Sequence, residues 1–327
     1  MGVAAVIVSD ATDVDLVQRA LASVLYQTHP VDEIVIVEAK RRITNDLEEM
    51  VHRMGGNVLL EHYDCYNASL ARNHGAMLCS SEYICFLDGD DEWSPHMIED
   101  RMALMDDDVC IITSPYARMK DKNGTLDLFT PTVPSGTELF GRNVIGSNSY
   151  VMVRREPFME VGGFDPHLVY HQDWDLWIRM LEHGKVAISP RLGGIKYYNN
   201  FSASHNSAVC RDGWSCFVRK WGHIYRHERV HLDSVIGLYS QHMSCFNKTG
   251  RPVKGPLGFM CRIILGRLPS WFDNLVHGER PNRNRITSIG EVGHRIPSLK
   301  DEVKPQLICM MYQMFKGGRI RPGSCHS

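Results

Sequence analysis

The sequence predicts an α/β fold, built on a mostly parallel sheet that is flanked by helices. Short β-branched segments alternate with amphipathic helical segments through the first half of the chain, and the connections between them are short. With 43% hydrophobic and 23% charged residues, the 327-residue chain has an ordinary globular composition. It is long enough for one large core or two domains.

Each element of the first half is predicted from a local pattern. The segments 3–8 and Glu33–Glu38 are short β-branched runs suited to buried strands. Between them, Asp13 is placed to cap a helix with one apolar face. By the same criteria, three more strands are predicted at 57–63, 83–87 and 108–113, and one more helix is predicted at 69–79. Ser94-Pro95 then opens a further helix, with proline at its tolerated first position.

The second half is predicted to begin after an exposed turn at 120–124. A strand at 149–153 and a Gly162-Gly163 turn lead to a helix at about 172–183, whose first turn contains Asp173. Further strands are predicted at 186–189 and 195–198. From about residue 206 the pattern changes to longer helical stretches, and 279–305 reads as loops.

An acidic cluster directly follows the predicted strand at 83–87, in the segment YICFLDGDDEW. Asp88 and Asp90 are separated only by Gly89, so both carboxylates can face one ion from a tight loop. Oxygen ligands suit Mg²⁺ or Mn²⁺, which often share a substrate diphosphate with the protein. A solvated turn is the alternative. Because ligands of open α/β sheets bind at the carboxyl ends of the strands, we favour metal binding.

Two other segments contain candidate functional residues. In VGGFDPHLVYHQDWDLWIRML, Asp173 and Asp175 stand at a helix start behind a glycine turn, where one of them is either a general base or a helix cap. In NASLARNHG, Arg72 and Asn73 are candidates for binding a diphosphate or ribose, and surface salt bridging is the alternative. No phosphate loop, dinucleotide fingerprint or nucleophile elbow is present.

The ten cysteines contain no C-x-x-C pair, and Cys85 and Cys110 lie within apolar runs. This pattern argues against a zinc ribbon or a disulfide scaffold and favours buried thiols in a reducing compartment. There is no secretory signal, and no apolar run approaches the ~18 residues of a membrane span. We therefore expect a cytoplasmic protein, and we expect no nucleic-acid partner.

Charge divides the chain into an acidic and a basic part. Residues 210–327 contain 19 Lys/Arg and 8 Asp/Glu, whereas the preceding residues contain 17 and 30. The basic part either faces an anionic surface or is attracted to the acidic part. Its segment 257–276 is either an interfacial membrane helix or, as we favour because Pro269 interrupts it, a helix docked on the rest of the protein. Peripheral contact with the cytoplasmic face of a membrane therefore stays open.

Four segments in this order resemble a known family: EIVIV, SLARNHGAMLCSSEYICFLDGDDEWSP, GSNSYVMVRREPFMEVGGFDPHL and HQDWDLWIRML. They are similar to glycosyltransferase family 2, the inverting nucleotide-sugar transferases of GT-A fold. The resemblance covers roughly residues 3–205. It implies a GT-A domain at 1–205 with a Rossmann-like, mostly parallel sheet, followed by a basic, mainly helical region at 206–327 that has no assigned role.

On the side of the sugar donor, the resemblance implies that Asp88 contacts the ribose or the metal. Asp90 would bridge Mn²⁺ or Mg²⁺ to the diphosphate, with Asp91 as a helper. Arg72 and Asn73 would lie beside the nucleotide.

On the acceptor side, the resemblance implies that Asp173 is the catalytic base and that Gln172 lines the acceptor pocket. A further set would shape this side: Gly162, Gly163, Phe164 and Asp165.

The nucleotide end departs from the family pattern. Ser9-Asp10-Ala11-Thr12 stands where the family has Pro-Thr-Tyr-Asn, and Glu38 replaces the usual aspartate at the end of the second strand. Glu38 is still able to accept a base N–H, but a UDP-sugar is only the default choice of donor. The expected acceptor is a hydroxyl of a glycan, a lipid-linked saccharide or a protein.

Two other functions remain as alternatives. A non-catalytic binding or scaffold protein would keep the fold and lose the sugar donor. A sugar-phosphate nucleotidyltransferase would need a glycine-rich loop after the first strand, and SDATD is not such a loop.

Overall fold

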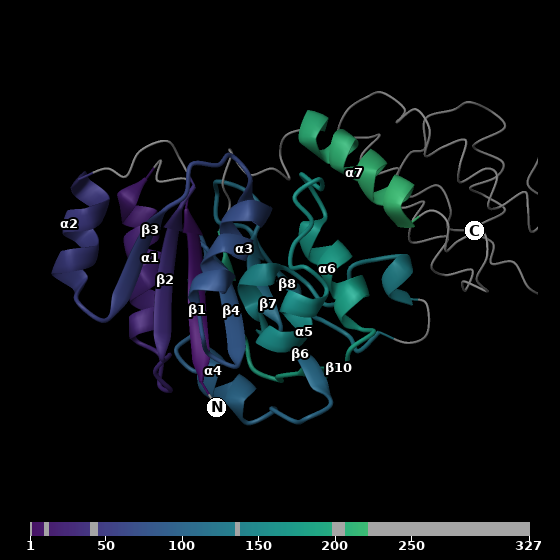
Figure 1. Cartoon of the computed structure of the whole chain (residues 1–327), viewed down its shortest axis with the longest axis horizontal. Coiled ribbons are helices and arrows are strands. Elements are labelled where there is room, and N and C mark those ends of the chain that lie inside the picture. Colours follow the sequence, from purple (N-terminus) through teal and green to yellow (C-terminus); the bar gives the residue numbers. More distant parts are fainter. Residues whose placement is uncertain (1, 10–12, 40–44, 135–137, 198–206, 222–327) are drawn as a thin grey trace, which may run out of the picture. The chain divides into compact units, whose positions relative to one another are not determined.

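The computed structural model describes residues 2–9, 13–39, 45–134, 138–197 and 207–221. The described residues up to Leu139 and from Asn143 to Val218 form one compact unit. Within it, a central sheet of seven strands has the order β10-β6-β9-β4-β1-β2-β3, and a smaller sheet has the order β5-β11-β7-β8 (Figure 1). This arrangement confirms the predicted α/β fold.

The strands of the central sheet are β1 (Val3–Ser9), β2 (Glu33–Glu38), β3 (Val58–His62), β4 (Tyr83–Asp88), β6 (Val109–Thr113), β9 (Val151–Arg154) and β10 (Lys185–Ile188). Strand β1 runs parallel to β2 and β4, β2 parallel to β3, and β6 parallel to β10. Only β9 is antiparallel to its neighbours, so the sheet is mostly parallel as predicted. The register pairs Ser9 with Glu38 and Val8 with Asp88, which places these acidic residues at the same edge.

The helices are α1 (Val14–Leu25), α2 (Asn45–Met54), α3 (Ala68–Leu78), α4 (Met97–Met102), α5 (Arg155–Glu160), α6 (Gln172–Met180) and α7 (Ser207–Trp221). Asp13 caps α1 as predicted, because its side chain accepts a hydrogen bond from the backbone N–H of Asp15. Asn67 caps α3 in the same way, accepting from the N–H groups of Ser69 and Leu70. Both caps satisfy backbone donors that an uncapped helix start would leave without partners.

The smaller sheet contains β5 (Glu92–Trp93), β7 (Tyr116–Met119), β8 (Leu126–Phe129) and β11 (Gly194–Lys196). Strands β7 and β8 form an antiparallel hairpin around the predicted turn at 120–124. Strand β11 pairs antiparallel with β5, Gly194 opposite Trp93 and Ile195 opposite Glu92. This pairing joins the end of β11 to the loop that follows β4.

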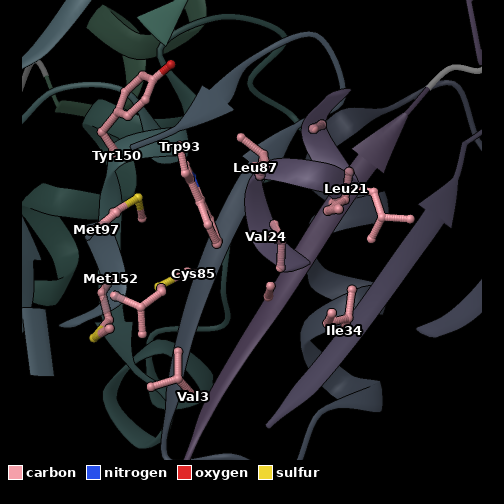
Figure 2. Packing of buried hydrophobic residues seen from close by; sticks show 14 of the residues in the cluster. Val3, Leu21, Val24, Ile34, Cys85, Leu87, Trp93, Met97, Tyr150 and Met152 are labelled. Carbon is pink, nitrogen blue, oxygen red and sulfur yellow. The ribbon is translucent and has the colours of Figure 1, made fainter. Parts of the chain in front are cut away.

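The core fills the space between the central sheet and the helices (Figure 2). Its members are fully or almost fully buried, and the residues labelled in the figure are Val3, Leu21, Val24, Ile34, Cys85, Leu87, Trp93, Met97, Tyr150 and Met152. The Trp93 indole N–H donates to the backbone carbonyl of Ser149 over 2.6 Å, so the buried ring is satisfied at its polar end.

Gly75 lies in the middle of α3, where glycine is ordinarily unfavourable. A Cβ at this position would lie 2.5 Å from Cγ1 of Val6 and 2.9 Å from Cγ2 of Val37. The absence of a side chain therefore allows α3 to pack directly on β1 and β2. This close packing fixes the position of the helix that carries Arg72.

Several predicted boundaries differ from the structure. The helix predicted from Ser94-Pro95 begins at Met97, since residues 94–96 form the preceding turn. The strand predicted at 149–153 is β9, and residues 149–150 belong to a short 3-10 helix, Asn148–Tyr150. The helix predicted to reach residue 183 ends at Met180. Strand β10 begins one residue earlier than predicted, and β11 lies at 194–196 rather than 195–198.

The predictions for the rest of the chain are tested only in part. No disulfide joins the cysteines that the structure describes. None of the described helices combines the length and the apolarity needed to cross a membrane. Helix α7 agrees with the predicted helical start of the region after residue 206, and residues 207–218 belong to the first compact unit. The segments 257–276 and 279–305 lie outside the described residues, and the division at residue 205 remains a prediction.

Candidate active site

Strand β4 ends in the acidic loop, which turns tightly against the end of β1. The Gly89 N–H donates to the Val8 carbonyl over 2.9 Å. A Cβ on Gly89 would lie 3.2 Å from both that carbonyl oxygen and the Ser9 Cβ. Glycine therefore allows the loop to pack closely, and the loop turns as the sequence predicted.

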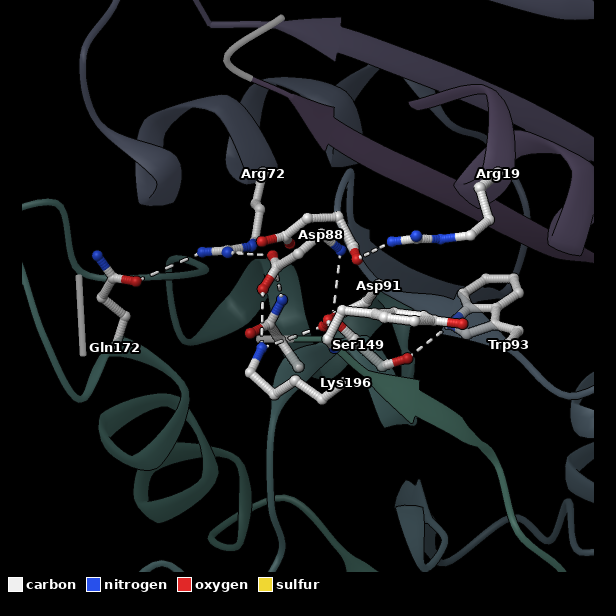
Figure 3. Close-up of polar contacts among 11 residues, drawn as sticks. Arg19, Arg72, Asp88, Asp91, Trp93, Ser149, Gln172 and Lys196 are labelled. Atoms are coloured by element: carbon white, nitrogen blue, oxygen red, sulfur yellow. Dashed lines mark hydrogen bonds and ion pairs between the residues drawn. The ribbon is translucent and has the colours of Figure 1, made fainter. Parts of the chain in front are cut away.

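Asp88 accepts hydrogen bonds from two neighbouring side chains (Figure 3). Its Oδ1 accepts from Nη2 of Arg72 at 2.5 Å and from Nδ2 of Asn148 at 3.0 Å, while its Oδ2 lies 3.6 Å from Nζ of Lys196. Burial alone would raise the pKa of Asp88, but the Arg72 guanidinium and the Lys196 ammonium outweigh it and hold that pKa well below its usual range. Asp88 is therefore a carboxylate at neutral pH, with 23% of its side chain exposed.

Asp91 is fully buried and anchors the loop to its neighbours. Its Oδ2 accepts from Oγ of Ser149 at 2.7 Å and from Nζ of Lys196 at 3.1 Å, and its Oδ1 accepts from the backbone N–H of Tyr197 at 3.2 Å. Burial raises the pKa of Asp91, and the Lys196 ammonium opposes this effect. Since both oxygens of Asp91 already accept hydrogen bonds, its contacts hold the loop in place.

Arg19 of α1 holds the loop from another side. Its Nη2 donates to the Asp90 carbonyl at 2.6 Å, and its guanidinium lies over the Tyr197 ring at 3.7 Å from the centroid. The Tyr197 hydroxyl in turn donates to Oε2 of Glu92 at 2.8 Å. The backbone of the acidic loop is therefore fixed before any ligand binds.

The three aspartates of the loop offer a set of ligand atoms for a metal ion. One carboxylate oxygen from each of Asp88, Asp90 and Asp91 lies within 4.8 Å of the others. Hard divalent cations such as Mg²⁺ and Mn²⁺ bind oxygen atoms of this kind. The carboxylates of this loop therefore fit a divalent metal, and the fully buried Asp91, which holds the loop through both of its oxygens, is the least accessible of the three.

The start of α6 lies next to the acidic loop, as Figure 3 shows for Gln172. Oε1 of Gln172 accepts a hydrogen bond from Nη1 of Arg72 at 3.4 Å. Asp173 follows, and its Oδ1 accepts from the Trp174 N–H at 2.7 Å. Burial raises the pKa of Asp173 to about 6, although the charges of Arg72 and Lys196 oppose the rise. A carboxylate with this pKa is suited to accept a proton near neutral pH.

Asp175 was the other candidate base in α6. It is fully buried, and its Oδ2 accepts from Nε and Nη2 of Arg179 at 3.0 and 2.7 Å. Arg179 also donates to the Val161 carbonyl at 2.8 Å. This pair connects α6 to the preceding glycine turn, which is a structural role.

The glycine turn on the predicted acceptor side packs against α3. The Asn73 amide makes two hydrogen bonds of 2.8 Å to the backbone of Phe164, one to its carbonyl and one from its N–H. Gly163 has a φ of +67°, and a Cβ there would lie 2.4 Å from Oδ1 of Asn73. Asn73 therefore positions the turn, and its predicted contact with the nucleotide remains a prediction. Asp165 caps the next turn through the His167 N–H at 2.9 Å.

The predicted nucleotide end is described only in part. Glu38 is fully buried at the end of β2, next to Ser9 at the end of β1. Residues 10–12, which depart from the family pattern, lie outside the described residues. The role of Glu38 toward a base remains a prediction.

Sequence reasoning missed several residues of this site, namely Arg19, Asn148, Ser149, Lys196 and Tyr197. Ser149 was assigned only to a strand, and residues 195–198 only to another. The strand pairing of β11 with β5 brings Lys196 to a residue 105 positions away. No local pattern signals such a contact.

Comparisons with known proteins find similar sequences and similar folds. Residues 7–162 match the family model described as Glycosyl transferase family 2. AmsB, an amylovoran biosynthesis glycosyltransferase of Erwinia amylovora, is 30% identical over 53% of this chain and 62% of its own length. TuaG of Bacillus subtilis, a putative teichuronic acid biosynthesis glycosyltransferase, is 26% identical over 70% of this chain and 89% of its own length. The chain thus spans less than two thirds of AmsB.

Among solved structures, S. aureus TarS 1-349 in complex with UDP-GlcNAc superposes with a TM-score of 0.63 at 14% identity, covering 98% of this chain and 93% of that chain. Mannosyltransferase PcManGT of Pyrobaculum calidifontis, in complex with GDP-Man and Mn²⁺, has a TM-score of 0.50 at 13% identity, covering 96% and 84%. At these identities the likeness concerns the fold.

Proposed function

We propose that the chain belongs to glycosyltransferase family 2, whose model matches residues 7–162, and that it transfers a sugar from a nucleotide-sugar to an acceptor hydroxyl, with inversion at the anomeric carbon. A UDP-sugar is the default donor. The solved neighbours contain UDP-GlcNAc in one case and GDP-Man in another, and both are nucleotide-sugars.

One observation supports this function most strongly. The Arg72 guanidinium contacts Asp88 with Nη2 and Gln172 with Nη1, and so connects the acidic loop after β4 with the start of α6. A candidate metal-binding loop and a candidate base, Asp173, therefore belong to one site. A transferase needs both groups at the same place, since the leaving group and the attacking hydroxyl act on the same carbon.

On the side of the sugar donor, Asp88 and Asp90 would hold Mn²⁺ or Mg²⁺. When bound, such an ion would offset the negative charge that develops on the departing diphosphate. Arg72 and Asn148 keep the Asp88 carboxylate in a fixed orientation through its Oδ1. Arg19 fixes the backbone of Asp90 through its carbonyl.

On the acceptor side, Asp173 would take the proton of the attacking hydroxyl. The hydroxyl oxygen forms a bond to the anomeric carbon as the bond from that carbon to the diphosphate breaks, and the electron pair leaves with the diphosphate. With a pKa of about 6, Asp173 is mostly ionised at pH 7 and able to accept this proton. Gln172 and the glycine turn around Gly163 would form the rim of the acceptor pocket.

The acceptor that we favour is the hydroxyl of a growing glycan. AmsB and TuaG are named for the biosynthesis of amylovoran and teichuronic acid. A lipid-linked saccharide or a protein are the other acceptor classes.

A thermal-shift screen of nucleotide-sugars with Mn²⁺ tests the donor site. Because ligands that bind only the folded state raise its melting temperature, at least one nucleotide-sugar should raise the Tm. Asp90→Ala should lose the part of this rise that depends on Mn²⁺, whereas Asp107→Ala, in the exposed turn before β6, should keep it. If no nucleotide-sugar shifts the Tm with or without Mn²⁺, the proposed function is contradicted.

For the segment 257–276 of the basic region 206–327, we propose docking on the rest of a cytoplasmic protein, with peripheral membrane contact as the alternative. Flotation with vesicles of anionic lipid, using the chain with and without residues 222–327, separates the two. Flotation of the full chain, but not of the chain without residues 222–327, would favour peripheral membrane contact.

A further inference from the structure

We propose that Lys196 is a second cation of the donor site, whose ammonium contacts the diphosphate of the nucleotide-sugar, so that part of the affinity for a nucleoside diphosphate is independent of metal. This inference rests on the proposed function and adds to it a residue that sequence reasoning did not identify.

The position of Lys196 follows from strand pairing. Gly194 and Ile195 of β11 pair with Trp93 and Glu92 of β5, and the next residue of β11 is Lys196. Its ammonium reaches the acidic loop, 3.1 Å from Oδ2 of Asp91 and 3.6 Å from Oδ2 of Asp88 (Figure 3). A cation from a distant part of the sequence thus lies against the predicted metal-binding loop.

The contacts of Lys196 leave capacity for a ligand. An ammonium has three N–H donors, and the hydrogen bond to Asp91 uses one of them. The distance of 3.6 Å to Asp88 is an ion pair rather than a hydrogen bond. The side chain is 32% exposed, while Asp91 is buried, so the remaining donors can face the open side of the site.

Arg101 provides a contrast within the same protein. It is fully buried and donates to the carbonyls of Met97 and Tyr150 and to the hydroxyl of Ser114. Such a cation has a structural role only, because no ligand can reach it. Lys196 differs from it by its exposure and by its position on the functional loop.

The charges of the site favour a cation at this position. Three aspartates, Asp88, Asp90 and Asp91, would repel a diphosphate electrostatically. Arg72 contacts one oxygen of Asp88 and Lys196 faces the other, so two cations flank this carboxylate. A diphosphate bound beside Asp88 would meet both.

The alternative is that Lys196 serves only as the counter-ion of the buried Asp91. The two roles differ in their effect on ligands. A counter-ion stabilises the fold and leaves the binding of a diphosphate unchanged, whereas a cation of the donor site contributes directly to that binding, with or without metal.

Isothermal titration of nucleoside diphosphates (UDP, GDP, ADP and dTDP) and of inorganic pyrophosphate, in EDTA and in Mg²⁺, separates these roles. Lys196→Gln, which keeps an N–H donor for Asp91 and removes the charge, should weaken binding in EDTA at least ~10-fold for the tightest of these ligands, the scale of one charge-assisted contact. Lys196→Arg should stay within about 3-fold of the wild type, since it keeps the charge.

Lys185→Gln is the matched control. Lys185 is the first residue of β10, whereas the acidic loop follows the carboxyl end of β4. Lys185 pairs with Asp108. Its loss should leave the affinity unchanged. Melting temperatures of all three variants show whether each is folded, and Lys196→Arg provides a second measurement if Lys196→Gln fails to fold, since Arg must then retain binding.

Two results would overturn the inference in distinguishable ways. If the wild type binds a nucleoside diphosphate in Mg²⁺ and Lys196→Gln binds it in EDTA as the wild type does, Lys196 is only a counter-ion and the proposed function stands. If the wild type binds none of these ligands in either condition, the donor site itself is contradicted, and the role of Lys196 fails with it.

Discussion

The proposed role of Asp173 as a general base can be tested by the pH dependence of the rate. Burial raises the pKa of its carboxyl to about 6, and a general base must be ionised in order to accept a proton. The kcat/KM of the wild type should therefore be constant above about pH 7 and fall as the pH drops through about 6. Initial rates measured from pH 5 to pH 8.5, at a saturating nucleotide-sugar concentration and varied acceptor concentrations, provide this profile of kcat/KM for the acceptor.

The variant Asp173→Asn tests whether Asp173 is the group that titrates in this pH profile. It keeps the oxygen that accepts from the Trp174 N–H, so the helix start should remain intact. Turnover should fall at least ~100-fold, the usual contribution of a general base, and donor binding should be retained. Asp175→Asn would disturb the Arg179 contact and is therefore a control for stability rather than for catalysis. If the kcat/KM of Asp173→Asn still falls as the pH drops through about 6, a group other than Asp173 titrates there.

Only those residues of the site that belong to a recognisable local sequence pattern could be predicted. Asp88 and Asp90 were predicted because they follow a buried strand, and Asp173 because it begins a helix behind a glycine turn. Lys196 has no such local pattern, since its role depends on a two-residue pairing between β11 and β5. Likewise, the hydrogen bonds of the Asn73 amide to Phe164 join residues 91 positions apart and have no local signal, while the predicted contact of Asn73 with a nucleotide stays a prediction.

Helix α3 shows how an element fixes the site. It carries Arg72, and Gly75 allows its close packing on β1 and β2. Gly75→Val should lower the free energy of unfolding by about 1–3 kcal/mol, because its side chain would collide with Val6 and Val37. Urea unfolding followed by circular dichroism measures the change.

Met77→Val is the matched control on the same helix. Met77 is 62% exposed, so valine there changes helix propensity without a collision. It should cost less than about 1 kcal/mol. Equal losses of unfolding free energy in the two variants would show that the close packing of Gly75 against the sheet is not important for stability.

The strands were the elements best predicted from the sequence. The first five predicted strands all lie where the structure has them, because strands of a parallel sheet are short, largely apolar runs. The helix α2 and the hairpin β7-β8 were missed, and in both the apolar signal is weak. Helix α2 buries only Leu47 and Met50, and β8 leaves Leu126 and Leu128 exposed.

At the scale of the whole molecule, the boundary of the first compact unit has a physical basis in the packing of α7. Its Trp214 and Phe217 are fully buried and lie against Trp174 of α6, with ring centroids 6.4 and 4.4 Å apart. His171, which precedes α6 with a φ of +64°, contacts both rings as well. Because α6 begins with Gln172 and Asp173, α7 supports the helix that would carry the base.

A chain shortened at residue 205 should therefore be less stable than one shortened at residue 221. Removing α7 exposes Trp174, and burial of each large aromatic side chain contributes on the order of 2 kcal/mol. We expect a lower Tm and a tendency to aggregate for the shorter chain, measured by differential scanning fluorimetry and light scattering. Equal melting temperatures would place the boundary at residue 205 and contradict a supporting role for α7.

The acidic loop and Asp173 are proposed to form one active site of a nucleotide-sugar transferase. The most direct measurement is the slow release of nucleoside diphosphate from a panel of nucleotide-sugars in Mn²⁺, without acceptor, by the wild type, Asp90→Ala and Asp173→Asn. We expect release above the protein-free blank by the wild type with at least one nucleotide-sugar, and a strong reduction in both variants. Release by the wild type equal to the blank with every nucleotide-sugar would contradict this proposal and favour a non-catalytic binding protein.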